Sequence, residues 1–201
     1  MRKAMPNERL EKQIGFILEI DKLKHILRKT ILVDRSRREN SAEHSWHIAL
    51  SVLILSEYTP DEAIDLFRVM KMLLVHDLVE IDAGDTYCYD EKGVEDQEVR
   101  ERQAADRIFN LLPQDQAQNL RSLWEEFEAK TTPESKYANA LDRLQPFLLN
   151  YFTNGQTWIE NRVKQSQVIK RMQPVQKGAP FLWEYVNELI KLAVQKGYLE
   201  E

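Results

Sequence analysis

The stretch Val75–Asp85 constrains this chain more than any other part of the sequence. A mostly apolar run, residues 69–74, leads directly into one histidine and four acids: His76, Asp77, Glu80, Asp82 and Asp85. Burying that much acid without a counter-charge costs several kcal/mol. Neutral imidazole and ionised carboxylate are the ligands that divalent metal ions take in proteins. The stretch therefore predicts a metal site at the end of a core segment.

The composition favours a helical globular protein. Of 201 residues, 43% are hydrophobic and 30% are charged, with only 6 Gly and 7 Pro. A chain of this length buries roughly 70% of its unfolded surface, so we expect one domain over residues 1–201. A net charge of −5 indicates no general basic field for a nucleic acid polymer or an anionic membrane.

The single cysteine, Cys88, excludes an intrachain disulfide and fits a cytoplasmic protein. We expect it to be an inert thiol, because no second cysteine or activating motif accompanies it. The N-terminus carries no apolar signal-peptide block, and no run of about 18 apolar residues occurs. A membrane-spanning segment is therefore not expected.

Apolar residues recur at helical spacing along most of the chain, which predicts an all-α fold of about seven to nine helices. Ser41 is the expected N-cap of the second helix, and Thr59 with Pro60 marks the start of the third. The expected helices cover residues 10–27, 41–58, 59–80, 94–112, 113–130, 132–152, 156–172 and 180–195. Residues 28–40 are expected to form a loop, in which five of thirteen residues are cationic.

Three of these helices carry residues able to bind one metal ion. His44 lies early on the second, the pair His76 and Asp77 near the end of the third, and Asp142 on the sixth. Such a mixed nitrogen and oxygen set suits a first-row divalent ion with positions left for water or substrate. Taken alone, His44 also fits an ordinary core histidine, and Asp142 an ion pair with Arg143.

Three blocks of sequence, in this order, resemble the HD-domain phosphohydrolases, and among them small proteins similar to bacterial 5'-deoxynucleotidases. The blocks are Glu39–Trp46, His76–Asp85 and Leu141–Leu144. The resemblance covers about residues 10–152, with the helices of residues 156–197 beyond it. It implies one divalent ion (Co, Mn, Mg or Zn) with the ligands His44, His76, Asp77 and Asp142.

The resemblance also implies the reaction, which is hydrolysis of a nucleoside 5'-monophosphate, a small-molecule substrate. Asp77 and Glu80 would be catalytic, with Glu80 acting on the attacking water, although a solvated helix end is the ordinary alternative for Glu80. The residues expected to contact the substrate are Arg28, Lys29, Arg38 and Asp85. The cationic run that holds three of them also fits an ordinary solvated loop.

Some features leave alternatives open. Lys29 stands where deoxyribose-selective relatives carry Trp, so the choice between ribose and deoxyribose is not fixed. A phosphodiesterase or pyrophosphohydrolase of signalling nucleotides and a non-catalytic, metal-stabilised nucleotide sensor are the alternative functions. His25 and His47 match no motif position and are expected to be structural, with His47 as a neighbour of the site. Asp82 is expected to be a solvated helix end.

The C-terminal third is rich in large apolar side chains. More of them are present than a chain of this size needs inside, which predicts a homodimer. The side chains are Trp158, Phe181, Leu182, Trp183 and Tyr185.

Overall fold

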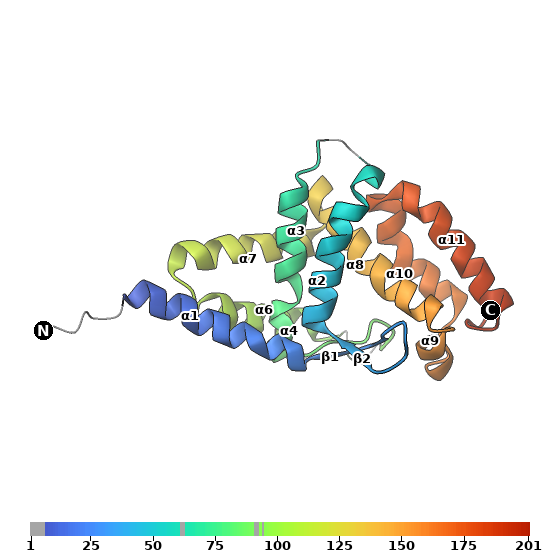
Figure 1. Ribbon diagram of the computed structural model, residues 1–201, viewed down its shortest axis with the longest axis horizontal. Helices are drawn as coiled ribbons and strands as arrows, with labels where there is room; N and C mark the ends of the chain where they lie inside the picture. The colour runs from blue at the N-terminus through green and yellow to red at the C-terminus, as the bar shows by residue number, and fades with distance from the viewer. Residues whose placement is uncertain (1–6, 61–62, 91–92, 94) are drawn as a thin grey trace, which may run out of the picture.

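The computed structural model describes residues 7–60, 63–90, 93 and 95–201. Helices dominate it, with one small antiparallel sheet at their edge (Figure 1). The α-helices are α1 (Glu8–Ile20), α2 (Ser41–Ile54), α3 (Leu66–Val75), α4 (Glu80–Ala83), α6 (Gln97–Phe109), α7 (Gln114–Ala129), α8 (Pro133–Phe152), α9 (Gln156–Glu160), α10 (Gln165–Gly178) and α11 (Pro180–Gln195). The strands are β1 (Leu27–Ile31) and β2 (Arg38–Asn40), and the 3₁₀ segments are η1 (Asp21–His25), η2 (Ser56–Tyr58) and η3 (His76–Val79). The predicted all-α class is confirmed.

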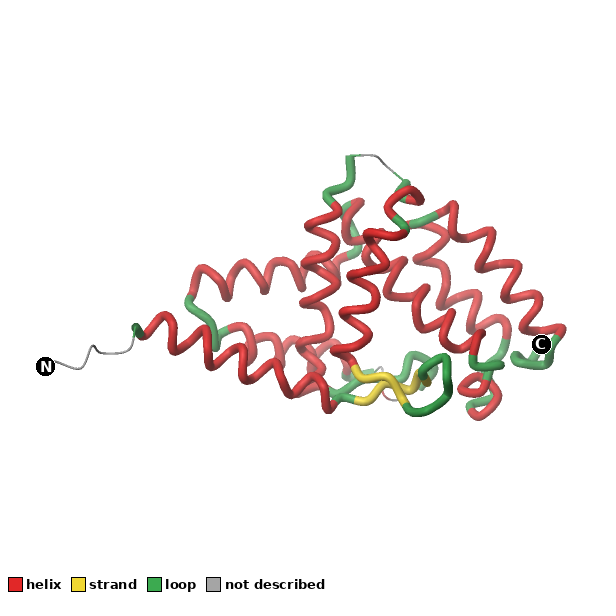
Figure 2. Tube along the Cα trace, in the orientation of Figure 1, coloured by secondary structure: helices red, strands yellow, loops and turns green. Residues whose placement is uncertain are grey.

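Helices α2, α3 and α8 form the middle of the molecule (Figures 1 and 2). One large core joins them to α10 and α11, with Ile48, Met72 and Leu141 almost fully buried. A second core lies between η3, α6 and α7 around Ile108. The chain passes from the first core to the second at the end of α3, so η3 lies at their junction.

Two helices have the limits predicted from the sequence, and local signals mark the start of each. Thr132 caps α8 through a reciprocal hydrogen-bond pair with Ser135, and Pro133 occupies the first turn. Pro180 begins α11 in the same way. Pro146 lies inside α8 and cannot donate a hydrogen bond to the carbonyl four residues earlier, so a kink there stays a prediction.

The prediction of a loop over residues 28–40 is confirmed for residues 32–37 and wrong for the two ends of the segment, which are strands. β1 and β2 pair antiparallel, with Leu27 opposite Asn40 and Ile31 opposite Arg38. Neighbouring residues in a strand point to opposite faces, which leaves Arg38 exposed and buries Glu39. Such short strands carry no periodic signal, because each is stabilised by pairing with the other across the connection of residues 32–37.

The predicted starts of two helices are also wrong. Asn40, not Ser41, is the N-cap of α2, and Glu43 completes a reciprocal capping pair with it. The third helix begins after Asp65, whose side chain accepts a hydrogen bond from the Arg68 backbone N–H. Thr59 and Pro60 lie outside a helix, and residues 61–62 lie outside the described part of the chain.

Other predicted helices are shorter or divided. The predicted helix of residues 59–80 is replaced by α3 and η3, with α4 beginning at Glu80, and the predicted helix of residues 156–172 is replaced by α9 and α10, which extends to Gly178. Arg162, between α9 and α10, has a φ of 50°, which a continuous α-helix does not allow. The helix expected from residue 94 begins at Gln97, because residues 95 and 96 form a turn, and residue 94 lies outside the described part.

The apolar side chains exposed in the C-terminal third differ from those expected. Trp158 is a core residue with 1% exposure, so it is not available to a partner, whereas Phe181 and Tyr185 are exposed. Large exposed apolar side chains are also frequent on α1, α2 and α3, among them Trp46 and Ile54. Within the described residues, no helix combines the length and the apolar character needed to cross a membrane.

The close packing of α8 and α10 yields a prediction on Gly178. A Cβ atom there would lie 2.2 Å from the Lys136 carbonyl oxygen, which is backbone and cannot rotate away. Gly178→Ala should therefore lower the free energy of unfolding by about 1–3 kcal/mol, the usual cost of overpacking. Gly15→Ala on α1, where a Cβ meets nothing within 4 Å, should raise it by about 0.5–1 kcal/mol. Urea denaturation measures both, and a stabilised Gly178→Ala protein would refute the prediction.

Candidate metal centre

Side chains from three separate helical segments meet at the junction of the two cores. His44 comes from the first turn of α2, His76 and Asp77 from η3, and Asp142 from the middle of α8. All four are buried. His44 Nε2 lies 3.0 Å from Asp142 Oδ1 and 3.9 Å from Asp77 Oδ2, and His76 Nε2 lies 2.9 Å from Asp77 Oδ1. The structure thus brings together the four residues predicted to bind metal.

The backbone at the end of α3 determines the protonation of His76. Its Nδ1–H donates to the Leu73 carbonyl at 2.9 Å, a carbonyl that the end of the helix leaves free. Nε2 is then the nitrogen with a lone pair. It is buried and has no correctly aligned hydrogen-bond partner among the described residues, although Asp77 Oδ1 is close. A nitrogen and an oxygen that lie close without bonding each other are arranged like two ligands of one ion.

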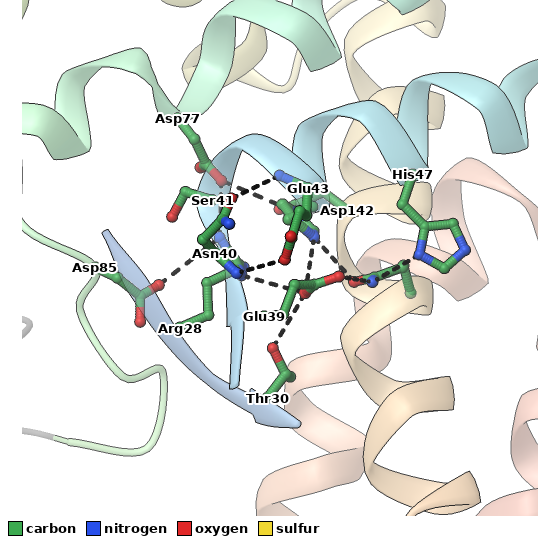
Figure 3. A network of polar contacts seen from close by, with 12 residues as sticks. Arg28, Thr30, Glu39, Asn40, Ser41, Glu43, His47, Asp77, Asp85 and Asp142 are labelled. Carbon is green, nitrogen blue, oxygen red and sulfur yellow. Dashed lines mark hydrogen bonds and ion pairs between the residues drawn. The ribbon is translucent and has the colours of Figure 1, made fainter. Parts of the chain in front are cut away.

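A chain of hydrogen bonds orients His44 in the same way, and Figure 3 labels two of its members, Glu39 and His47. Gln145 Nε2 donates to Glu39 Oε1 at 2.6 Å, which turns the Gln145 Oε1 toward His44. His44 Nδ1–H donates to that oxygen at 2.9 Å, so the Nε2 lone pair faces Asp142. His47 extends the chain, because its Nδ1 lies 3.1 Å from Gln145 Nε2. His47 is therefore a neighbour of the site, as expected.

The cluster holds more negative than positive charge. Its acids are Glu39, Asp77, Glu80, Asp85 and Asp142. Among the described residues, Arg28 lies within ion-pair distance of four of them, and Arg143 pairs with Asp142. Two guanidinium groups do not balance five carboxylates, and uncompensated buried charge is costly.

The ionisation of the cluster indicates where the missing positive charge belongs. Burial lowers the pKa of His76, but the charges of Asp77 and Asp142 outweigh it and raise that pKa well above its ordinary value. Burial raises the pKa of Asp77, yet His76 and Arg28 lower it to about 2. The surrounding carboxylates therefore favour positive charge between His76, Asp77 and Asp142. A divalent cation would supply it without protonating the imidazole.

The spacing of the donor atoms fits such an ion. Ligands that each lie about 2.1 Å from one cation are roughly 3–4 Å apart. The four imidazole–carboxylate pairs, which join His44 and His76 to Asp77 and Asp142, span 2.9 to 3.9 Å. Ligand atoms of His44, His76 and Asp77 also lie within 4.8 Å of one another. Two imidazoles and two carboxylates suit Mn, Co or Zn better than calcium, which prefers oxygen alone.

Glu80 lies beside the ligand set but is held by other groups. Ser41 Oγ–H donates to Glu80 Oε2 at 2.6 Å, and Glu80 Oε1 lies 3.9 Å from Arg28 Nη1. Burial and the charge of Asp77 raise the pKa of Glu80 well above its ordinary value. This carboxylate is therefore oriented, buried and a stronger proton acceptor than an exposed glutamate.

A cavity of about 770 Å³ opens onto the cluster and exposes it to small molecules. Arg28, Asp77, Glu80 and Asp85 line it, together with Asp142. Arg28 Nη1 donates to Asp77 Oδ2 at 2.7 Å and lies 3.7 Å from Asp85 Oδ1. Arg28 thus holds the acidic wall of the cavity together.

The other predicted substrate contacts differ in position. Lys29 is exposed, lines a narrower adjoining cavity with Arg28 and Asp85, and has its Nζ 6.0 Å from the centre of the Tyr87 ring. Arg38 lies on the outer face of β2, away from the buried Glu39, so the structure does not bring it to the cluster. The run of cations at residues 28–38 therefore contains both site residues and solvated ones.

Several residues in or near the cluster were missed by sequence reasoning. Glu39, Ser41 and Gln145 orient other groups by contacts between distant segments, and only the resemblance to known blocks pointed near them. Of the residues expected to be inert, His25 is exposed and Asp82 pairs with Arg107. Burial raises the pKa of the Cys88 thiol, which disfavours the reactive thiolate.

Comparison with known proteins identifies the family. The family model described as HD domain matches residues 20–183, which include every residue of the cluster. The chain therefore belongs to the HD-domain family.

Individual relatives share this fold and part of the sequence. The crystal structure of a protein described as a predicted metal-dependent phosphohydrolase from Magnetospirillum magnetotacticum has a TM-score of 0.91 and 50% identity, covering 97% of this chain and 100% of that one. A 5'-deoxynucleotidase from Bos taurus is 32% identical over 110 residues, or 55% of this chain and 52% of the relative. The chain thus matches about half the length of that relative. A Pyrococcus horikoshii structure with 20% identity, TM-score 0.62 and coverage of 89% and 99% shares the fold alone.

Replacing a ligand tests the metal centre directly. His76→Ala or Asp77→Ala should lose bound metal, because each change deletes a donor atom from the set. Elemental analysis after equilibration with Mn or Co should give near-stoichiometric metal for the parent protein and much less for both variants. His25→Ala, an exposed histidine, is the control and should keep the metal. Full metal content in either ligand variant would refute the assignment.

Proposed function

We propose that this protein is a metal-dependent phosphohydrolase that removes the phosphate of nucleoside 5'-monophosphates, including deoxyribonucleotides. The observation that carries the proposal is the convergence of His44, His76, Asp77 and Asp142, with the oriented Glu80 beside them, at the wall of an open cavity. Membership of the HD-domain family and the similarity to a 5'-deoxynucleotidase support the choice of substrate.

The metal and the protein have separate roles in this proposal. A divalent ion held by His44, His76, Asp77 and Asp142 would lower the pKa of a water molecule and polarise the phosphoryl group. Glu80 would take the proton from the attacking water, with Ser41 fixing one carboxylate oxygen so that the other is free for the proton. Arg28 would contact the phosphate, and Asp85 and Lys29 would lie on the side of the sugar.

A phosphate-release assay tests this function. Metal-stripped protein, reloaded separately with Mn, Co, Mg or Zn, would be given ribo- and deoxyribonucleoside 5'-monophosphates with each base. Release of phosphate from these substrates supports the proposal. Turnover of only cyclic or pyrophosphorylated nucleotides would replace it with a phosphodiesterase or pyrophosphohydrolase, and tight binding without turnover would replace it with a sensor.

Glu80→Gln separates proton transfer from metal binding. The amide keeps the shape and can still accept the Ser41 hydrogen bond, but it is a far weaker base. We expect kcat to fall by about 10²–10⁴-fold, the usual range for general acid-base catalysis, with KM and metal content little changed. Asp82→Asn, in the same helix but paired with Arg107, should keep kcat within about twofold. Loss of metal in Glu80→Gln would instead make Glu80 a ligand.

The proposal also covers the assembly and location of this chain. We expect residues 1–201 to act as one domain in a cytoplasmic homodimer. Exposed apolar groups at helical spacing on α2, beside α3, favour that surface for the partner copy.

Light scattering tests the dimer. At tens of micromolar the parent protein should have twice the monomer mass. Leu53→Glu on the exposed face of α2 should shift it to the monomer, because a charge would be buried in the interface. Phe181→Glu on α11 is the matched control. It places the same charge on the alternative, C-terminal surface and should leave the dimer intact. A monomer mass for the parent protein would remove the claim.

A further inference from the structure

A second cavity, of about 670 Å³, lies between α8 and α10 and is lined by cations. No acid is present among the described residues that line it, although the chain as a whole has a net charge of −5. The cationic residues that line it, called here the basic cavity, are Lys130, Lys136, Arg143, Lys170, Arg171 and Lys177.

Apart from Lys130, which follows α7, the cations come from stripes on α8 and α10, two helices that pack side by side (Figure 1). Lys136 and Arg143 are seven residues apart on α8, and Lys170 and Lys177 are seven apart on α10, so each pair shares a helix face. The contact of Gly178 with the Lys136 backbone fixes the two stripes at close range. The basic cavity is therefore set by helix packing rather than by flexible loops.

Most of these charges lack a partner. Lys136, Lys170, Arg171 and Lys177 form no ion pair with any residue that the structure describes, whereas Lys130 pairs with Glu128 and Arg143 with Asp142. Arg171 is partly buried, and burial together with the positive charge of Arg143 lowers its pKa. Cations gathered without carboxylates repel one another, and a bound anion would remove that repulsion.

The basic cavity adjoins the cavity of the metal centre. Arg143 and Arg171 line both the basic cavity and the cavity that contains the metal ligands. Arg143 also contacts the ligand Asp142 directly. An anion in the basic cavity would thus lie next to a phosphate that is positioned for hydrolysis at the metal.

We propose that the basic cavity binds a second phosphate group while the first is at the metal centre. The inference rests on the proposed function and extends it to nucleotides that carry two phosphate groups, such as nucleoside 3',5'-bisphosphates. Guanidinium groups at the junction would hold the anion by paired hydrogen bonds, and the lysines would supply charge. A free polyphosphate offers the same chemistry, and the experiment separates the two sources.

The test compares deoxyadenosine 5'-monophosphate with deoxyadenosine 3',5'-bisphosphate on metal-loaded protein. The bisphosphate should have a KM about tenfold lower, since three exposed charge contacts of modest strength give a change of that order. In the triple variant Lys136→Ala, Lys170→Ala and Lys177→Ala this difference should disappear, while KM for the monophosphate changes less than threefold. The control, Lys12→Ala, Lys22→Ala and Lys191→Ala, removes the same charge elsewhere and should keep the difference.

Calorimetry with inorganic pyrophosphate, at saturating monophosphate, completes the test without needing turnover of the probe. One outcome is that pyrophosphate binds to the parent protein but not to the triple variant, while KM is equal for both nucleotides. This outcome assigns the cavity to a free polyphosphate. Equal KM values together with no pyrophosphate binding would overturn the inference. An equal rise of both KM values in the triple variant would also overturn it, because the lysines would then serve the reacting phosphate. If no nucleotide is hydrolysed but pyrophosphate binding depends on the three lysines, the proposed function fails and the anion site stands.

Discussion

The structure depends on the concentration of negative charge at the junction of its two cores. Five carboxylates converge there, and Arg28 contacts four of them. Buried carboxylates are tolerated only where cations and hydrogen bonds offset the loss of hydration. Four segments must therefore meet at this point, because each supplies charged or hydrogen-bonding groups to the cluster. They are the β-hairpin, the start of α2, η3 and the middle of α8.

The orientation of the two histidines proposed as metal ligands follows from groups outside the proposed ligand set. Glu39 fixes the amide of Gln145, and that amide fixes the protonated nitrogen of His44. The free carbonyl of Leu73, at the end of α3, does the same for His76. Both imidazoles thus present a lone pair to the same point, and hydrogen-bonded partners of this kind strengthen a metal site. The chain changes from α-helix to 3₁₀-helix at His76, the residue whose imidazole the Leu73 carbonyl orients.

Helix α8 couples the metal centre to the basic cavity. It presents Asp142 to the ligand set, Gln145 to His44, and Lys136 and Arg143 to the cavity beside α10. A shift of α8 would therefore move the metal ligand and the cationic stripe together. The close approach of Gly178 to the α8 backbone limits such a shift. The packing of α8 against α10 therefore links the geometry of the two cavities.

The sequence by itself determined the helical class and the residues at which α8 and α11 begin. Thr132, Pro133 and Pro180 mark these starts through interactions within one turn of the chain. It also identified the acids and histidines that meet in the cluster, since their blocks resemble a known family. Asn40 caps α2 through a reciprocal pair with Glu43, which is a local signal. The tertiary structure alone decided that the Ser41 hydroxyl meets Glu80 and that Glu39 faces inward. Local signals cannot fix these choices, because each depends on a partner supplied by a distant segment of the chain.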